Sequence, residues 1–416
     1  MINWQGLYAD RVAEMRASDI RDAFRLSEQP DIISFAGGFP TSESFPTEQL
    51  MADMQRVLTQ DAASALQYGP TEGILELRKV IAQNMCSEGV ECTYENILVT
   101  NGSQQALDLI CKLFINPFDP MLVELPAYIG GLNAALNYQA RFIGIPLDNE
   151  GLNTQVLAEQ LANMQSIGTR MPKLIYVVPN FHNPTGVTMS QQRREHLLEL
   201  ANHYNFLVIE DNPYGKLRYE GNTVPHIKVD DTQQRVLYLG SYSKVFLPGL
   251  RLGWVVAAKP IIQKMTVAKQ GTDLCTNTLG QKLACEFTRT GALEPHAVKL
   301  RQIYRRKRDL AINAMQKHFP SSVHWTVPQG GFFTFVTLPA WMDAKALLAQ
   351  AVAEEKVAYV PGGAFYVDNS GKNTIRLAYS QASDEDLLEG ITRLGRFFHK
   401  VIASQSGQTG ASALAC

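Results

Sequence analysis

The sequence has no excess of charge of either sign. Its 416 residues include 38 Lys and Arg against 40 Asp and Glu, for a formal net charge of −2. A chain that binds nucleic acid or an anionic membrane through its overall charge needs a basic excess, so we expect neither partner. The basic run KLRQIYRRKRDL lies in a predicted helix over residues 291–317. We interpret it as a solvated helix face, with nucleic acid binding as the alternative.

The sequence also lacks paired cysteines and long apolar runs. Its six cysteines form no CxxC pair and show no metal-like spacing with histidine. Scattered cysteines in a chain of this length indicate reduced thiols, so we expect a cytoplasmic protein without a bound metal. No run of about 18 apolar residues is present, and the N-terminus MINWQGLYADR has no apolar signal core. We therefore expect no membrane span.

The composition is that of a soluble globular enzyme, with 45% hydrophobic and 19% charged residues. At this length a single hydrophobic core stops growing, which favours two domains. Between about residues 65 and 290, short apolar runs alternate with helical patterns, which predicts an α/β fold with a mostly parallel sheet covered by helices. The predicted strands lie at residues 97–100, 121–125, 173–179, 206–210 and 236–240, and helices lie at 104–114 and from 190 onward.

The C-terminal part has a different order of elements. The long helix at 291–317 is followed by predicted strands at 331–338, 357–360 and 374–378, and by helices from about 344 and from about 383 to 403. This order indicates a smaller α+β domain. We expect residues 1–45 to be an N-terminal segment that contributes to the small domain, 46–295 to be the large domain, and 296–416 to be the C-terminal small domain. The small, polar tail Ser404–Cys416 is expected to fray.

Polar residues follow the predicted strands at the points where the strands end. These clusters are residues 102–103, 126–128, 180–186, 211–214 and 241–244. In open α/β sheets, ligands bind beyond the carboxyl ends of the strands, where loops carry the chemistry. The five clusters are therefore expected to converge on one site.

The segment from Ser241 to Trp254 is the strongest local signal. Ser241, Ser243 and Arg251 provide two hydroxyls and a guanidinium fork, which suit a phosphate. Lys244 beside them can form a Schiff base with an aldehyde once desolvation and neighbouring cations lower its pKa. The alternative is a surface turn that contains a lysine. Glycines that flank an apolar strand here disfavour this alternative.

The same segment, SYSKVFLPGLRLGW, resembles the lysine signature of pyridoxal 5′-phosphate-dependent aminotransferases of fold type I, class I/II. The resemblance runs from ISFAGGFP through QYGPTEG, NGSQQALDL, VVPNFHNPTG, EDNPYGKLRYEG and WTVPQGGFF to TIRLAYS. The branch it resembles most is that of the 2-aminoadipate, kynurenine and aromatic aminotransferases. The resemblance implies a seven-stranded-type sheet with helices on both faces, and binding of pyridoxal 5′-phosphate by the large domain.

The resemblance also implies roles for residues that would hold the cofactor ring. Lys244 would form the Schiff base and move a proton between substrate Cα and cofactor C4′. Asp211 would pair with the pyridine nitrogen and keep it protonated. Asn183 and Tyr214 would hydrogen-bond O3′, and Tyr128 would stack on the ring. The alternatives are a cap or turn aspartate, an Asn-Pro turn and a packing tyrosine.

A second implied group would hold the cofactor phosphate. Ser103 and Gln104 begin a helix whose backbone N–H groups and dipole would face the phosphate. Ser103 is also a candidate N-cap, which is a structural alternative compatible with that role. Ser241, Ser243 and Arg251 would complete the phosphate-binding group.

The remaining implied residues concern the substrate and the partner subunit. Arg376 would bind the substrate α-carboxylate, because an unpaired arginine in an apolar strand is costly; a structural salt bridge is the alternative. Gly38 would let the backbone approach the substrate. Arg21 would read a distal carboxylate or line the side-chain pocket, unless it is a solvated helix residue. Tyr68 would reach the phosphate of a neighbouring subunit in a homodimer with shared sites, unless it is a loop aromatic.

These residues predict a transaminase that moves an amino group from an L-amino acid to a 2-oxo acid such as 2-oxoglutarate, by a ping-pong mechanism on Lys244. Another reaction at Cα, as in a β-lyase, decarboxylase or synthase, is one alternative. A ligand-sensing regulator is another, although such proteins carry a DNA-binding domain before this part and only residues 1–32 precede ISFAGG here. The physiological donor, the acceptor and the pathway stay open.

Overall fold

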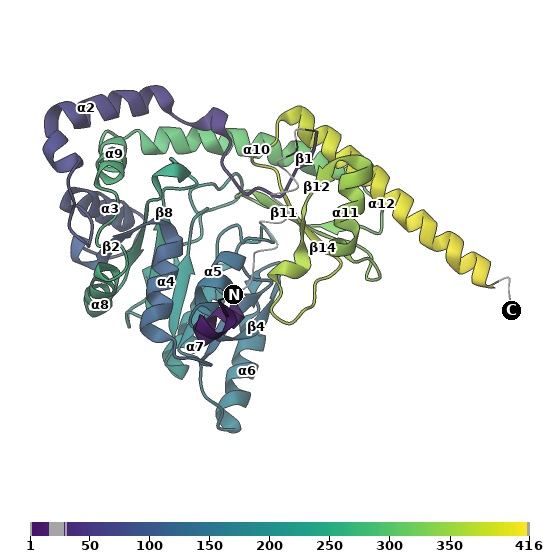
Figure 1. The fold of residues 1–416 in the computed structure, drawn as a ribbon, viewed down its shortest axis with the longest axis horizontal. Coiled ribbons are helices and arrows are strands. Elements are labelled where there is room, and N and C mark those ends of the chain that lie inside the picture. The colour runs from purple at the N-terminus through teal and green to yellow at the C-terminus, as the bar shows by residue number, and fades with distance from the viewer. Residues whose placement is uncertain (1, 16–28, 30, 414–416) are drawn as a thin grey trace.

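The computed structural model describes residues 2–15, 29 and 31–413. Figure 1 shows a large sheet with its helices beside a smaller group of strands and helices. The large sheet contains, in spatial order, β2 (Ile97–Thr100), β9 (Gly253–Val256), β8 (Val236–Ser241), β7 (Leu207–Asp211), β6 (Leu174–Val177), β3 (Pro120–Leu125), β4 (Arg141–Asp148) and β5 (Gly151–Leu152). The neighbours from β8 to β4 pair in parallel, whereas β9 pairs antiparallel with β2 and β8, and β5 pairs antiparallel with β4.

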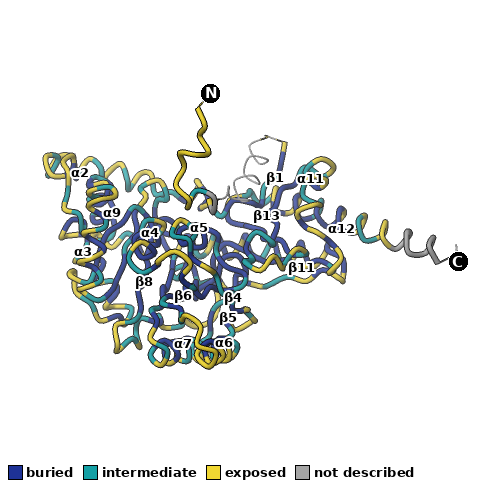
Figure 2. Tube along the Cα trace, turned by 60° about the horizontal axis from the view of Figure 1, so that its bottom comes forward, coloured by how far each residue is buried: buried dark blue, intermediate teal, exposed yellow. Residues whose placement is uncertain are grey.

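Helices cover both faces of this sheet. One face packs against α4 (Gly102–Phe114), α5 (Ile129–Leu136) and α8 (Lys259–Gln270), and the other against α6 (Thr154–Ser166) and α7 (Gln191–Tyr204). Strands β2, β6 and β8 are buried at every position, as expected for strands covered on both faces. Figure 2 shows the same arrangement, with buried residues in the central strands and exposed residues on the outer helices.

The smaller part contains a four-stranded antiparallel sheet. Its order is β10 (His324–Trp325), β11 (Phe333–Thr337), β14 (Thr374–Ala378) and β13 (Val360–Pro361), and a separate parallel pair joins β1 (Ile33–Ser34) to β12 (Val357–Ala358). Helix α12 (Asp384–Ala413) packs on α10 (Leu293–His318) and α11 (Ala344–Glu355). The chain from Ile33 therefore joins the part of the molecule that holds the C-terminal helices.

The chain also forms further α-helices and short 3₁₀ helices. They are α2 (Thr47–Ala65), α3 (Leu75–Ser87) and α9 (Thr278–Arg289), and the 3₁₀ helices η1 (Gln5–Leu7), η2 (Asp10–Glu14), η3 (Ser42–Ser44), η4 (Tyr94–Asn96), η5 (Ile227–Asp230), η6 (Pro248–Leu250) and η7 (Gly362–Phe365). No helix in the described part of the chain has both the length and the apolar composition needed to cross a membrane.

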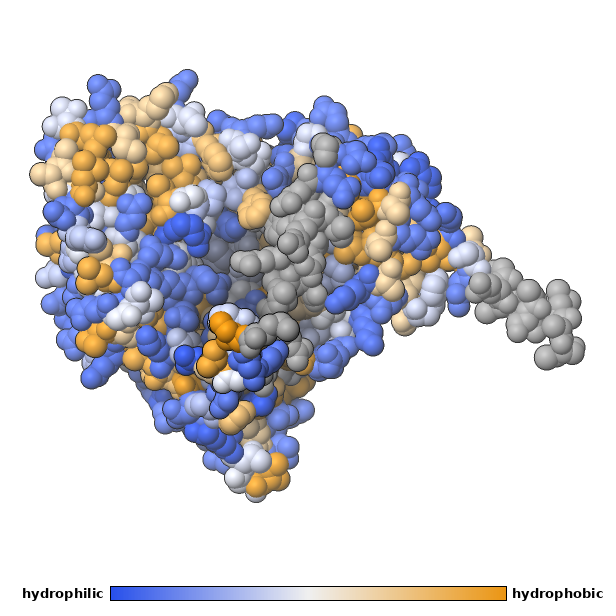
Figure 3. Space-filling model, viewed as in Figure 1, coloured by the Kyte–Doolittle hydropathy of each residue, from blue (hydrophilic) through white to orange (hydrophobic). Residues whose placement is uncertain are grey.

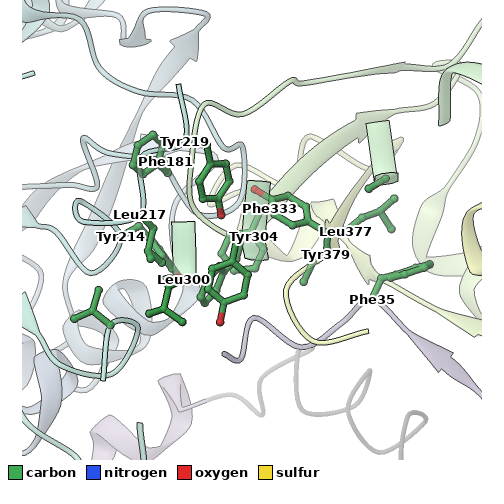
Figure 4. Close-up of a cluster of buried hydrophobic side chains, with 14 of the residues drawn as sticks. Phe35, Phe181, Tyr214, Leu217, Tyr219, Leu300, Tyr304, Phe333, Leu377 and Tyr379 are labelled. Atoms are coloured by element: carbon green, nitrogen blue, oxygen red, sulfur yellow. The ribbon is translucent and has the colours of Figure 1, made fainter. Parts of the chain in front are cut away.

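A buried aromatic cluster joins the two sheets. Figure 4 shows Tyr214 and Tyr219, which follow β7, beside Phe333 of β11 and Tyr379, which follows β14. The Tyr379 hydroxyl donates to the carbonyl of Gly331 at 3.1 Å, and Tyr219 donates to the same carbonyl. Large aromatic side chains bury much apolar area, and their hydroxyls fix the contact geometry. The cluster therefore holds β11 and β14 next to the ends of the large-sheet strands.

The predicted α/β class is confirmed, and a strand lies at each of the five positions predicted for the large sheet. Strands β4, β5 and β9 also belong to this sheet and were not predicted from the sequence. The single strand predicted at 357–360 is two strands with different partners, β1 and β14. Helix α12 continues past Ser404 to Ala413, where no helical structure was predicted, and the fraying of this tail stays a prediction. The domain boundaries at residues 45 and 295 stay a prediction.

Candidate active site

A cavity of about 360 Å³ lies at the carboxyl ends of the large-sheet strands, against β11 and β14. Its wall contains every predicted site residue except Tyr68 and Arg21, namely Gly38, Ser103, Gln104, Tyr128, Asn183, Asp211, Tyr214, Ser241, Ser243, Lys244, Arg251 and Arg376. The five polar clusters at the strand ends therefore meet, as expected. Arg21 lies outside the described residues.

One end of the cavity is formed by the start of α4 and the segment after β8. Gly253 of β9 lies so close to α4 that a Cβ there would be 2.8 Å from the backbone nitrogen of Ser103. The Arg251 guanidinium lies over Gly102, where a Cβ would be 2.6 Å from Nη2. Because a helix start offers free N–H groups, this end suits a phosphate. The Ser103 Oγ is buried and has no partner among the described residues, which leaves it free to donate.

The predicted N-cap alternative for Ser103 is wrong. Helix α4 begins at Gly102, its N-cap residue is Asn101, and no side chain caps it. The positive φ of Gly102, 72°, is a backbone conformation that favours glycine and turns the chain from β2 directly into the helix. The side chain of Gln104, the second residue predicted at this helix start, donates to the carbonyl of Gly130 at 2.8 Å. This hydrogen bond connects α4 to α5.

The amine of Lys244 points into the cavity. Its Nζ donates to the carbonyl of Gly38 at 2.9 Å. Burial and the nearby guanidinium groups of Arg251 and Arg376 lower the pKa of Lys244 to about 8. The neutral amine, which is the nucleophilic and basic form, is therefore more accessible than in an ordinary lysine. The alternative of a lysine in a surface turn is wrong.

Asp211 is the last residue of β7, so it is neither a helix cap nor a turn residue. Its Oδ2 accepts a hydrogen bond from the Tyr176 hydroxyl at 2.8 Å, while its Oδ1 is buried without a partner among the described residues. Burial and the charge of Glu124 raise the pKa of Asp211 to about 7. An unsatisfied buried carboxylate oxygen is costly. A protonated ring nitrogen would supply the missing donor.

Arg376 lies in the middle of β14 and is 2% exposed. Its Nη1 donates to Asn183 Oδ1 at 2.9 Å and its Nη2 to the carbonyl of Ala36 at 2.6 Å, but its buried Nε has no partner in the described part of the chain. Burial lowers the pKa of Arg376 to about 10. The described residues form no salt bridge with it, which removes the structural alternative. A bound carboxylate would provide the absent counter-ion.

Aromatic rings and glycines shape the rest of the cavity. The Arg376 guanidinium lies 4.5 Å from the ring centroid of Phe333. A Cβ at Gly38 would be 2.5 Å from the Phe333 ring, and a Cβ at Gly130 would be 2.4 Å from the Tyr128 ring. Both glycines therefore allow a ring to pack on the backbone. Tyr214 is buried, and its ring meets that of Phe333 edge-on.

Sequence reasoning missed some residues of this site. Phe39 and Phe333 line the cavity, and Tyr176 lies behind Asp211. A tyrosine inside the apolar run KLIYVVP was a usable signal, because a buried hydroxyl needs a hydrogen-bond partner.

Tyr68 does not line the cavity, and it is 79% exposed. Within residues 2–15, 29 and 31–413, no group of three His, Cys, Asp or Glu could hold a metal ion.

Comparison with known proteins gives a consistent result. The model of the family "Aminotransferase class I and II" matches residues 30–394. The aromatic-amino-acid aminotransferase 1 of Thermococcus litoralis is 43% identical over 394 residues, which cover 94% of each chain.

Two solved structures extend the comparison. A kynurenine aminotransferase of Pyrococcus horikoshii, in complex with PMP, has a TM-score of 0.92 at 43% identity and covers 96% of this chain and 98% of its own. The alpha-aminoadipate aminotransferase of Thermus thermophilus, complexed with N-(5′-phosphopyridoxyl)-L-leucine, has a TM-score of 0.88 at 35% identity. The match covers 97% of this chain and 100% of that one.

Proposed function

The chain belongs to the class I and II aminotransferase family and is a pyridoxal 5′-phosphate-dependent transaminase, and on that premise we propose which residues carry the reaction and which substrates they accept. The observation that carries the proposal is the cavity in which Lys244, Asp211, Arg251 and Arg376 converge. The bound cofactor supplies an aldehyde that takes up the amino group and a ring that delocalises the electron pair left at Cα.

The two ends of the cofactor would be held by different elements. The backbone N–H groups at the start of α4, the hydroxyls of Ser241 and Ser243, and the Arg251 fork would bind the phosphate. At the other end, Asp211 Oδ1 would accept a hydrogen bond from the protonated ring nitrogen, which would satisfy its buried oxygen and favour the charged carboxylate. Asn183 and Tyr214 would bind O3′, and Tyr128 would cover a face of the ring.

Lys244 would first hold the cofactor and then transfer protons. A buried amine with a pKa near 8 is poised to take a proton from Cα and return it to C4′ close to neutral pH. Its hydrogen bond to the carbonyl of Gly38 holds the amine beside the backbone that we expect the substrate to approach. One residue would thereby serve as base and acid for the same reaction.

Arg376 would bind the α-carboxylate of every substrate. Its two hydrogen bonds, to Asn183 and to the Ala36 carbonyl, fix the plane of the guanidinium. A planar fork held in this way positions a carboxylate bidentately and so fixes Cα relative to Lys244. This constraint would favour reaction at one bond of Cα.

The substrate side chain would meet an uncharged wall. The charged groups that line the described cavity, Asp211, Lys244, Arg251 and Arg376, each have a task in this scheme. The remaining wall near the substrate includes Gly38, Phe39 and Phe333. We therefore expect aromatic or large apolar L-amino acids as donors. With 2-oxoglutarate as acceptor, Arg21 would read the distal carboxylate.

Lys244→Ala tests the assignment directly. The purified variant should lose both the visible absorbance of the bound cofactor and transamination, and retention of both would refute the role of Lys244. A panel of aromatic, branched and acidic donors with 2-oxoglutarate then tests the substrate class. Formation of glutamate supports transamination, whereas ammonia, pyruvate or CO₂ would indicate another reaction at Cα.

We also propose that the enzyme acts as a cytoplasmic homodimer. The Tyr68 loop is held by contacts within its own subunit. The Ile74 N–H donates to Gln281 Oε1 at 2.8 Å, and a Cβ at Gly69 would be 2.9 Å from Thr278 Oγ1. The side chain of Tyr68 is nevertheless 79% exposed. A fixed loop that presents an aromatic side chain to solvent suits a contribution to the site of a second subunit.

A further inference from the structure

Tyr176 reaches Asp211 from the neighbouring strand. It lies in β6 and is fully buried. In the parallel register it pairs with Ile209 of β7, and Asp211 lies two residues farther along on the same face. A tyrosine ring spans that diagonal, and its hydroxyl donates to Oδ2 at 2.8 Å. In the described part of the chain this is the only hydrogen bond of the hydroxyl.

The position of the Tyr176 ring depends on Gly131. A Cβ at Gly131, on α5, would lie 2.5 Å from Tyr176 Cε1 and 2.7 Å from Cζ. The neighbouring Gly130 makes the same kind of space for Tyr128. The Gly-Gly pair thus admits two tyrosine rings, one toward the cavity and one behind Asp211.

The surroundings of Asp211 explain why this contact matters. Glu124 is 1% exposed, accepts from the Val178 N–H at 2.8 Å, and lies 3.1 Å from His182 Nε2. The burial of Asp211 and the charge of Glu124 raise the pKa of Asp211, whereas the Tyr176 hydrogen bond and Lys244 lower it. Without the hydroxyl, both oxygens of Asp211 would lack a donor in the described structure, apart from any ligand.

We propose that Tyr176 is a positioning residue, which occupies Oδ2 of Asp211, fixes the plane of the carboxylate and thereby directs Oδ1 at the cofactor ring nitrogen. The inference rests on the proposed role of Asp211. Tyr176 itself touches neither substrate nor cofactor in this scheme. A tyrosine can donate one hydrogen bond, so the choice of Oδ2 leaves Oδ1 as the acceptor for the ring.

Tyr176→Phe in the full chain tests the proposal. The dissociation constant of pyridoxal 5′-phosphate, measured by equilibrium dialysis, should rise about tenfold, the effect of one hydrogen bond to a charged group. The single-turnover rate should fall by a similar factor while the KM of the amino donor stays within about twofold. Loss of the cofactor on acidification should begin at higher pH, because Asp211 loses a donor that favours its charged form.

Tyr359→Phe is the matched control. Tyr359 is equally buried, and its hydroxyl donates to the carbonyl of Ala344 at 2.9 Å, away from the cavity. This variant should keep the cofactor affinity and its pH dependence. If Tyr176→Phe also keeps both, or if Tyr359→Phe changes them equally, the proposal is wrong.

Gly131→Ala provides a second approach that retains the hydroxyl. The added Cβ displaces the ring, so cofactor affinity should fall, and the double variant with Tyr176→Phe should be no weaker than Tyr176→Phe alone. Additive losses would overturn the proposal. If Tyr176→Phe does not fold, Gly131→Ala alone decides. Asp211→Asn distinguishes a failure of the role proposed for Tyr176 from a failure of the role proposed for Asp211. If Asp211→Asn leaves the affinity for pyridoxal 5′-phosphate unchanged, the role of Asp211 itself is refuted.

Discussion

Three residues of the cavity wall carry a buried polar atom without a partner. Asp211 Oδ1, Arg376 Nε and Ser103 Oγ have no hydrogen-bond partner among the described residues. Each such atom costs about 1–3 kcal/mol in the folded protein. The three atoms are assigned to three parts of the ligands, namely the ring nitrogen, the α-carboxylate and the phosphate. Ligand binding would therefore recover part of this cost.

The buried amine of Lys244 predicts a pH-dependent stability of the apoprotein. Its pKa falls from 10.5 to about 8 on folding, mainly through burial, so the unfolded chain binds more protons between these values. The cost is complete below pH 8 and disappears as the pH rises toward 10.5. Lys244→Met should therefore raise the free energy of unfolding by about 2 kcal/mol at pH 7.

Urea titrations at pH 7 and pH 10 check this prediction. The gain of Lys244→Met over the wild-type apoprotein should shrink at the higher pH. Lys264→Met, in an exposed stretch of α8, should show no such gain at pH 7. An equal gain for Lys244→Met at both pH values would contradict the argument.

The geometry of Arg376 predicts a uniform loss of activity in Arg376→Lys. A lysine cannot keep the hydrogen bonds to Asn183 and Ala36 while it binds a carboxylate bidentately. We expect kcat/KM to fall by about 100-fold, roughly 3 kcal/mol, for all donors alike. Steady-state kinetics on the donor panel measures this. Loss of one donor with the others unaffected would instead make Arg376 a reader of the side chain.

At the scale of elements, parallel strands made much of the site predictable. Polar residues after β2, β3, β6, β7 and β8 converge because parallel strands end at one edge, and sequence pattern locates such ends. The contact of Tyr176 with Asp211 depends on strand order and register, which the pattern of one strand does not contain. The N-cap position of α4 was also missed, because it depends on the backbone path through Gly102.

The contact between β9 and α4 predicts a specific effect of Gly253→Ala. The new Cβ would lie 2.8 Å from the backbone of Gly102 and of Ser103, so the start of α4 must move. Overpacking of this kind costs about 1–3 kcal/mol. The dissociation constant of pyridoxal 5′-phosphate should therefore rise about tenfold or more.

Gly249→Ala is the control for this prediction, because a Cβ there meets nothing within 4 Å. Dialysis with pyridoxal, which lacks the phosphate, locates the defect. Gly253→Ala should weaken binding of pyridoxal less than binding of the phosphorylated cofactor. Equal losses for both would place the damage outside the phosphate end.

At the scale of the whole molecule, large apolar side chains are exposed on α2, directly after it, and at Leu274. Leu66 is 69% exposed, Met51 66% and Leu274 52%. Figure 3 shows hydrophobic residues gathered on the surface over α2. Exposed apolar groups that cluster in this way are typical of a protein interface. The contribution of Tyr68 to a second subunit was predicted only from the resemblance to the family. The residues of its loop do not by themselves indicate a contact with another chain.

A mixed dimer tests whether Tyr68 serves the site of the other subunit. One chain carries Lys244→Ala and the other Tyr68→Ala, with two affinity tags to isolate the heterodimer. If sites are shared, one of the two sites has both residues, and the heterodimer should show about half of the wild-type kcat per dimer. Each homodimer of the single variants should be nearly inactive.

The same two substitutions placed in one chain, opposite a wild-type partner, form the matched control. The wild-type chain then has its own Lys244 but receives the altered Tyr68, so this heterodimer should be nearly inactive. Composition and fold are the same in both arrangements, and only the distribution of the substitutions differs. If the cis and trans arrangements are equally active, Tyr68 serves neither site, and if only the cis arrangement is active, Tyr68 acts within its own subunit. A difference in the expected direction requires that the aromatic side chain crosses the subunit boundary, which also accounts for its exposure in the single chain.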